Sequence, residues 1–177
     1  MTHITLFALD RAAAASLSND STAFAEQHGV VLAPHETTVA AIAAATAEFL
    51  AATDAPPAWG GYLALEGATR RAVGTCGFKG GPDADGAVEI VYFTFPGEEA
   101  RGVATAMAAA LVDVARGGVP QVSVVRAHTL PERNASCRVL EKAEFQRAGN
   151  VIDPEDGPVW RWERPIGAAA ESGAHAV

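Results

Sequence analysis

The chain has 177 residues, of which 49% are hydrophobic and 19% charged, so it can bury a sizeable core. Its 13 Lys and Arg residues stand against 21 Asp and Glu residues, and the formal charge of −8 argues against a protein that binds nucleic acid through phosphate contacts. Two isolated cysteines, Cys76 and Cys137, lack the spacing of a zinc site or a disulfide framework, so we expect no metal and a reducing, cytoplasmic location.

We expect a single domain over residues 1–165 and a disordered tail at 166–177, where no periodicity is present. The N-terminal segment has no basic region before its apolar run, which Asp10 and Arg11 interrupt, so we expect no signal peptide. The alanine-rich run TTVAAIAAATA is bounded by glutamates and is too short to span a membrane. No membrane partner is therefore expected.

The first half of the chain predicts one strand, then helices, then three strands. ITLFAL at residues 4–9 is a short strand, and helices follow to about residue 52, the third starting at 36–38. Strand patterns then appear in GGYLALEG, RRAVGTCGF and GAVEIVYFTF, and the turn GGPDADG joins the last two. We expect three successive antiparallel strands.

The second half predicts a helix at 101–116 with one apolar stripe, then the strand QVSVVRAH. Thr129 and Glu132 have the spacing of a capping box, which predicts that the next helix starts there and runs to about residue 142. FQRAGNVI and VWRWER form a closing hairpin. The order of elements predicts a mixed α/β (α+β) unit.

The run FPGEEARGVATAM, where a strand gives way to a helix, is a candidate anion site. Amides in the first turn of a helix lack partners inside the helix, and the helix dipole is positive there. The small residues Ala100, Gly102 and Ala104 let a ligand approach the backbone. There is no GxxxxGK[ST] and no GxGxxG, which argues against a triphosphatase or a dinucleotide fold. A tight turn with only a packing role stays open.

Several segments in order, GTCGFKGGPDADGAVEIVYFTFPGEEARGVATAMAAALVDVA, VVRAHTLPERNASCRVLEKAEF and DPEDGPVWRWERP, resemble the GNAT superfamily of N-acetyltransferases, most closely its ribosomal-protein N-acetyltransferase branch. The resemblance covers about residues 59–165. It implies a mixed, mostly antiparallel central sheet flanked by helices, with acetyl-CoA as the cosubstrate. It also implies acetyl-CoA contacts from Phe93, Thr94, Phe95, Glu99, Ala100, Arg101, Gly102, Val103, Ala104, Thr105 and Asn134.

Three positions depart from the family pattern. Glu99 stands where relatives carry Gln or Arg, and its carboxylate would repel a pyrophosphate unless it points away. Arg101 is a candidate phosphate partner that compensates. Arg133 takes the place of the usual asparagine, with Asn134 one residue later, and Glu144 replaces a glycine.

Two residues are candidates for the chemistry. Glu89 shares a strand face with apolar neighbours, which suits a general base for the amine, although a solvated or salt-bridged glutamate fits the pattern equally. Ser136 lies on the packed stripe of its helix and is a candidate acid for the departing thiolate. The alternative for Ser136 is a hydrogen bond to the carbonyl of Glu132.

The acceptor site is predicted from aromatic residues and one histidine. Core packing is the alternative role for Trp160, and a structural hydrogen bond is the alternative for His128. The candidates are Trp59, Tyr62, His128 and Trp160. The function that follows is transfer of an acetyl group to a primary amine of a small molecule or protein N-terminus, by direct attack in a ternary complex. A regulatory module that binds acyl-CoA weakly and a purely structural domain are the alternatives, and both a monomer and a homodimer stay open.

Overall fold

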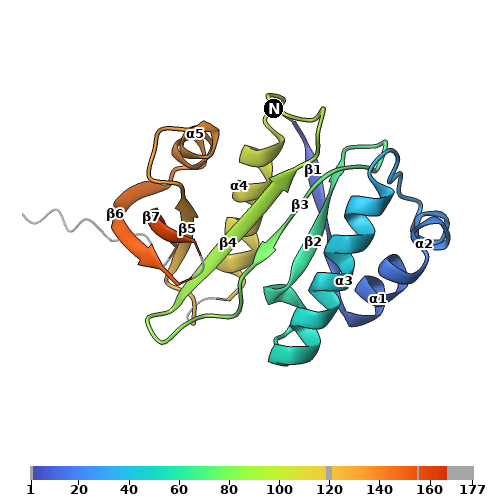
Figure 1. Cartoon of the computed structure of the whole chain (residues 1–177), viewed down its shortest axis with the longest axis horizontal. Coiled ribbons are helices and arrows are strands. Elements are labelled where there is room, and N and C mark those ends of the chain that lie inside the picture. Colours follow the sequence, from blue (N-terminus) through green and yellow to red (C-terminus); the bar gives the residue numbers. More distant parts are fainter. Residues whose placement is uncertain (1, 119–120, 155, 167–177) are drawn as a thin grey trace, which may run out of the picture.

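The computed structural model describes residues 2–118, 121–154 and 156–166. A seven-stranded sheet runs through the molecule in the order β1-β2-β3-β4-β5-β7-β6 (Figure 1). The strands are β1 (Ile4–Leu9), β2 (Gly61–Glu66), β3 (Arg71–Phe78), β4 (Ala87–Thr94), β5 (Val124–Thr129), β6 (Gln146–Asp153) and β7 (Gly157–Pro165). The helices are α1 (Arg11–Asn19), α2 (Ser21–His28), α3 (Glu36–Thr53), α4 (Val103–Arg116) and α5 (Ala135–Lys142), with a short 3-10 turn, η1 (Pro57–Trp59).

Two hydrophobic cores lie on opposite faces of this sheet. The first joins one face of β2, β3 and β4 to α4 and α5, with Met107 and Leu111 at its centre. The second joins the opposite face of β1 and β2 to α1, α2 and α3, through residues such as Leu17 and Leu63. Figure 1 shows α3 in front of β2, while no helix crosses in front of β4. One face of β4 is therefore left open.

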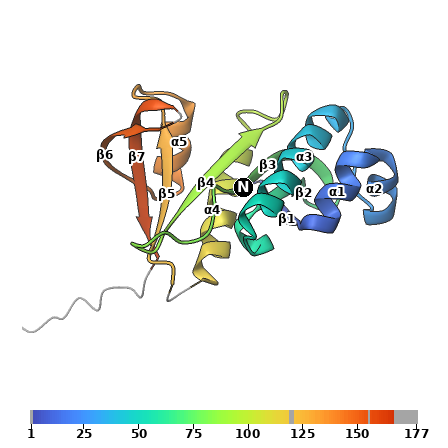
Figure 2. The same ribbon diagram turned by 60° about the horizontal axis from the view of Figure 1, so that its bottom comes forward.

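The sheet is split in its middle. All neighbouring strands pair antiparallel except β4 and β5, which are parallel and pair only at Ala87, Val88 and Glu89. Beyond Glu89 the two strands diverge, and Figure 2 shows them separating towards the top of the view. The backbone groups in the second half of β4 thus have no strand partner on the β5 side, which makes them available to a ligand.

Most predicted elements are confirmed, including β1, the three successive strands and the closing hairpin. The predicted capping box is wrong. Asn134 is the N-cap of α5 and accepts from the Cys137 amide at 3.1 Å, while Thr129 stays at the end of β5. The Thr129 hydroxyl is buried there and accepts from the indole N–H of Trp162 at 3.1 Å, so it serves the core instead of a helix end.

The predicted tail lies outside the described residues from 167 onward. Its first residue, Ile166, is buried and donates its amide to the Ser123 carbonyl at 3.0 Å, so ordered structure reaches one residue further than predicted. In the described part of the chain, every helix is too short or too polar to cross a membrane.

Candidate active site

The strand-to-helix turn at residues 95–102 has the features of an anion site. Gly97, Ala100 and Gly102 have positive φ angles of 88°, 60° and 82°, which turn the chain sharply out of β4 and into α4. Gly102 is the N-cap of α4, and no side chain caps the helix. The amides of the first turn are consequently open to a ligand.

Four ion pairs among Glu66, Arg71, Glu98 and Arg101 form a closed ring that connects this turn to the sheet. Arg71 and Arg101 each pair with both Glu66 and Glu98, so four ion pairs join the ends of β2 and β3 to the turn. The Glu98 side chain is only 8% exposed, and the Arg71 guanidinium holds the pKa of its carboxyl below the usual range. Thr2 also donates a hydrogen bond to the Arg101 carbonyl. The arginine expected to contact phosphate is thus already neutralised by two carboxylates.

Glu99, the main departure from the family pattern, is also engaged. Its carboxylate accepts a hydrogen bond from the Gly97 amide at 2.6 Å. This local bond ties the Glu99 carboxylate to the start of the turn. The other two departures make similar local contacts: Arg133 pairs with Glu141, and Glu144 pairs with Arg164.

A cavity of about 640 Å³ opens in front of the turn, between the second half of β4, the start of α4 and one face of α5. The Thr94 hydroxyl lines it, is buried, and has no hydrogen-bond partner among the described residues. Such an orphaned group needs a ligand or water as its partner. The predicted cosubstrate residues in its lining are Phe93, Thr94, Glu99, Ala100, Gly102, Val103, Ala104 and Thr105. Phe95, Arg101 and Asn134 are absent from this lining. Phe95 is fully buried in the core, while Arg101 belongs to the ring and lines the neighbouring groove beside α4.

Two cations in this cavity escaped the sequence analysis. Arg138 and Lys142 both line it from α5. Their spacing of four residues puts them on one face of the helix, and no ion pair is formed by either within the described chain. The signal was present in the sequence as two cations at i and i+4, but nothing in the sequence indicates that this face looks toward the start of α4.

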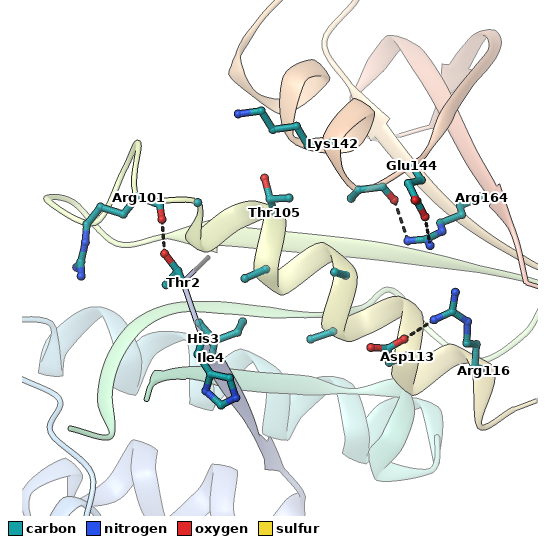
Figure 3. Close-up of a pocket in the computed structure, with 15 residues that line it drawn as sticks. Thr2, His3, Ile4, Arg101, Thr105, Asp113, Arg116, Lys142, Glu144 and Arg164 are labelled. Carbon is teal, nitrogen blue, oxygen red and sulfur yellow. Dashed lines mark hydrogen bonds and ion pairs between the residues drawn. The ribbon is translucent and has the colours of Figure 1, made fainter. Parts of the chain in front are cut away.

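The cavity continues into a groove of about 950 Å³ that follows the outer side of α4. Figure 3 shows Thr105 on the first turn of α4, with Lys142 of α5 on the other side of the opening. Gly102, Thr105 and Lys142 line both spaces. A long ligand could therefore lie with one end beside β4 and the other beyond the start of α4.

At the inner end of the cavity, the hydroxyls of Tyr92 and Ser136 meet. Burial raises the pKa of Tyr92 to about 12, and the hydrogen bond with Ser136 acts the other way. The phenol is therefore protonated at neutral pH and can donate. The Glu132 carbonyl, the alternative partner of Ser136, accepts instead from the Cys137 thiol at 3.4 Å. Tyr92 was not among the predicted catalytic residues because strand alternation alone did not pair it with α5.

A second cavity of about 330 Å³ lies on the other face of β4, between that strand and α3. Tyr92 and Phe93 line both this cavity and the first one. Val91 and Phe93 are 42% and 48% exposed, unusually high for large apolar residues in a central strand. The strand thus separates two cavities that share this pair of residues in their linings.

Glu89 lies on the same face of β4 as Val91 and Phe93, as predicted, and is part of a small polar cluster. Its carboxylate is 2.9 Å from Lys79 Nζ and 3.2 Å from His128 Nδ1, and that histidine nitrogen is also 3.6 Å from Asp153 Oδ2. The His128 side chain is 10% exposed, and neither ring nitrogen makes an aligned hydrogen bond within the described chain. Glu89 is therefore salt-bridged, which was one of the two alternatives, and its role as a general base stays a prediction.

Three predicted acceptor residues lie elsewhere. Trp59 packs edge-on against Phe78, with ring centroids 5.1 Å apart, and against the end of α4. Tyr62 is buried and donates to the Ala58 carbonyl at 2.8 Å. Trp160 carries the guanidinium of Arg147 4.0 Å from its ring centroid. Asn134, predicted to contact the cosubstrate, instead caps α5.

The model of the acetyltransferase (GNAT) domain family matches residues 4–146. Among solved structures, an aminoglycoside acetyltransferase in complex with coenzyme A has a TM-score of 0.62 and 20% identity, covering 92% of this chain and 95% of that chain. A variant spermidine N-acetyltransferase from Vibrio cholerae has a TM-score of 0.62 and 14% identity, covering 92% and 94%. A GNAT-family acetyltransferase from Bacillus anthracis has a TM-score of 0.61 and 14% identity, covering 94% and 97%. A comparison with curated proteins found no match.

Proposed function

The chain belongs to the GNAT family of N-acetyltransferases, and we propose that it transfers the acetyl group of acetyl-CoA to a primary amine at the place where its two cavities meet. The observation that carries this proposal is that Tyr92 and Phe93 line both cavities, so a thioester in one and an amine in the other would lie beside the same two residues of β4. A ternary complex needs this arrangement, because both substrates must reach one point together.

Acetyl-CoA occupies the larger cavity in this proposal. The open amides of Val103, Ala104 and Thr105 bind its pyrophosphate, and Arg138 and Lys142 add charge from α5. The unpaired edge of β4 near Phe93 bonds the pantetheine amides, and the Thr94 hydroxyl gains the partner it lacks. The groove beside α4 has room for the nucleotide end.

The amine enters from the α3 side and attacks the carbonyl carbon of the thioester directly. Glu89 accepts the proton of the attacking nitrogen, directly or through water, and His128 offers an acceptor 3.2 Å away from the Glu89 carboxylate. The carbon–sulfur bond then breaks and the thiolate of CoA leaves. The buried phenol of Tyr92 and the hydroxyl of Ser136 donate to that sulfur, and the phenol regains its proton from solvent.

No covalent intermediate on a cysteine is part of this proposal. Cys76 and Cys137 are buried free thiols, and burial raises the pKa of Cys76, which keeps it in the unreactive protonated form. The membership of the ribosomal-protein branch, the cytoplasmic location, and the single domain over residues 1–165 stay predictions. The amines that the structural neighbours are named for, aminoglycosides and spermidine, support an amine as the acceptor class.

A specific test uses Glu89→Gln. Release of CoA from acetyl-CoA with a panel of primary amines should fall by about 10²- to 10⁴-fold in kcat, the range of a lost general base. The Kd of acetyl-CoA should change little, because Glu89 lies outside the larger cavity. Glu141→Gln is the matched control, since Glu141 is an exposed glutamate on the outer side of α5.

Wild-type turnover in Glu89→Gln would remove that residue from the mechanism. Failure of the wild-type protein to release CoA with any amine, together with binding of acetyl-CoA, would favour the alternative of a regulatory acyl-CoA module.

A further inference from the structure

The cavity on the α3 side of β4 has a mostly apolar lining without charged side chains among its described residues. It is formed by Ile42, Ala45, Thr46, Phe49, Gly60, Gly61, Thr75, Cys76, Gly77, Phe78, Val91, Tyr92 and Phe93, and no acidic, basic or histidine side chain is among these residues. The polar groups of Thr46 and Cys76 in this lining are also uncharged. The Thr46 hydroxyl donates back to the Ile42 carbonyl at 2.9 Å, and burial raises the pKa of the Cys76 thiol.

Two large apolar side chains of β4 are exposed in this cavity, through which the amine enters in the proposed function. Val91 and Phe93 alternate on one face of β4 and reach exposures of 42% and 48%, and Phe49 of α3 closes the opposite wall. Figure 1 shows the reason, since α3 covers β2 and leaves the front of β4 uncovered. Burying these side chains against an apolar ligand would be favourable.

A charged cluster lies just outside this lining, further along β4. Glu89 stands two residues before Val91 on the same strand face, about 7 Å along the strand. Its cluster holds two carboxylates, Glu89 and Asp153, with Lys79 and His128 beside them. A single ammonium group therefore finds carboxylates at the Glu89 end, whereas a second ammonium placed deeper finds only apolar walls.

We propose, on the basis of the proposed function, that the acceptor is a primary amine with a single positive charge and an apolar body. The amine nitrogen lies near Glu89 and the thioester, and the apolar body fills the space between Phe93 and α3. A cavity of about 330 Å³ suits an aryl or short alkyl group. Polycationic amines are poor acceptors, because each further ammonium in this cavity loses its water without gaining a counterion.

Steady-state CoA release tests the proposal with four probes: phenethylamine, the peptide amide Phe-Ala-Ala, spermidine and kanamycin. We expect kcat/KM to be at least about tenfold higher for the probes with one charge and an apolar group than for the two polycations. Comparing kcat/KM for phenethylamine and for the peptide amide shows whether the acceptor is a free amine or a peptide N-terminus.

A substitution in the part of α3 that lines the cavity provides a second test, in which kcat/KM should change in opposite directions for the two kinds of amine. Ala45→Glu places a carboxylate in the cavity from an exposed helical position, so the variant should fold. It should lower kcat/KM for phenethylamine by about tenfold and raise that for spermidine. Ala51→Glu is the matched control, with the same change at an exposed position on another face of the same helix and outside the lining, and should leave the ratio of the two within about twofold.

Higher kcat/KM for spermidine or kanamycin in the wild-type protein would overturn this inference and leave the acetyltransferase proposal standing. An unchanged ratio in Ala45→Glu would also overturn it, because the amine would then bypass the cavity. No CoA release with any probe would overturn the proposed function, and the inference with it.

Discussion

Tyr92 is the residue whose ionisation connects stability and chemistry in this molecule. Because burial raises its pKa to about 12, the folded protein favours the neutral phenol, whereas the unfolded chain ionises near pH 10. Its contribution to stability is complete below pH 10 and is lost as the pH rises towards 12. A shift of two units corresponds to roughly 2.7 kcal/mol.

We therefore predict that Tyr92→Phe flattens the alkaline loss of stability. Urea unfolding between pH 9 and 12 should show a free energy of unfolding that falls by about 2 kcal/mol less than in the wild-type protein. At pH 7.5 the same variant should lower kcat about 10- to 100-fold with little change in the Kd of acetyl-CoA. Parallel alkaline curves for the two proteins would mean that the phenol does not titrate as described.

Glu144 shows what a single replaced glycine costs. It follows α5 with a φ angle of 63°, a left-handed conformation in which glycine is favoured and a side chain is strained. Glu144→Gly should raise the free energy of unfolding by about 1 kcal/mol, measured in urea, although it removes an exposed pair with Arg164. Glu141→Gly, one residue before the end of the same helix, should instead lower it by about 1 kcal/mol. The same sign for both would contradict this account of the helix end.

At the scale of elements, the turn between β4 and α4 depends on the ion-pair ring. Glu98 is the buried member, and its lowered pKa means that the carboxylate stabilises the fold above about pH 4.3, the usual range, and loses that effect as the pH falls through the lowered value. The ring also fixes the backbone just before Gly102, where the open amides of α4 begin.

We predict that Glu98→Gln lowers the free energy of unfolding at pH 7 by about 2 kcal/mol, because two guanidinium groups lose a shared partner. The difference from the wild-type protein should shrink as the pH falls below about 4.3, because the carboxylate is protonated first in the unfolded chain and only at the lowered pKa in the folded protein. The KM for acetyl-CoA should rise, since the turn loses its support. Asp113→Asn, which removes an exposed pair with Arg116, should stay within about 0.5 kcal/mol.

A difference that keeps its full size at pH 3 would show that the stabilisation does not come from the ionised carboxylate. An unchanged KM in Glu98→Gln would separate the ring from acetyl-CoA binding.

At the scale of the whole molecule, local patterns were enough to predict the order of elements. Period-two and helical patterns with clear turn chemistry gave β1, the strands β2, β3 and β4, and the final hairpin. The capping box at Thr129 misled because a hydroxyl with the correct spacing was drawn into the core by Trp162. The position of the Thr129 side chain depends on a contact with a residue 33 positions away, which a local sequence pattern cannot indicate.

The site was predictable where it depends on backbone and less so where it depends on side chains from distant elements. The turn before α4 and the shared face of Glu89, Val91 and Phe93 follow from sequence. The contact of Tyr92 with Ser136 and the ring around Glu98 join separate elements, so only the fold reveals them. Trp59 packs against Phe78, and Tyr62 donates to the Ala58 carbonyl, contacts that their residue types alone did not indicate.

The most direct test of the central claim is the thermal midpoint with and without saturating acetyl-CoA. A ligand at one hundred times its Kd adds about 2.7 kcal/mol, which for a chain of 177 residues corresponds to a rise of roughly 5 to 10 °C. We predict a rise of that size in the wild-type protein and a smaller rise at the same ligand concentration in Glu98→Gln. No rise in a folded wild-type protein would contradict it, since the turn, the orphaned Thr94 hydroxyl and the α5 cations would then have no common ligand.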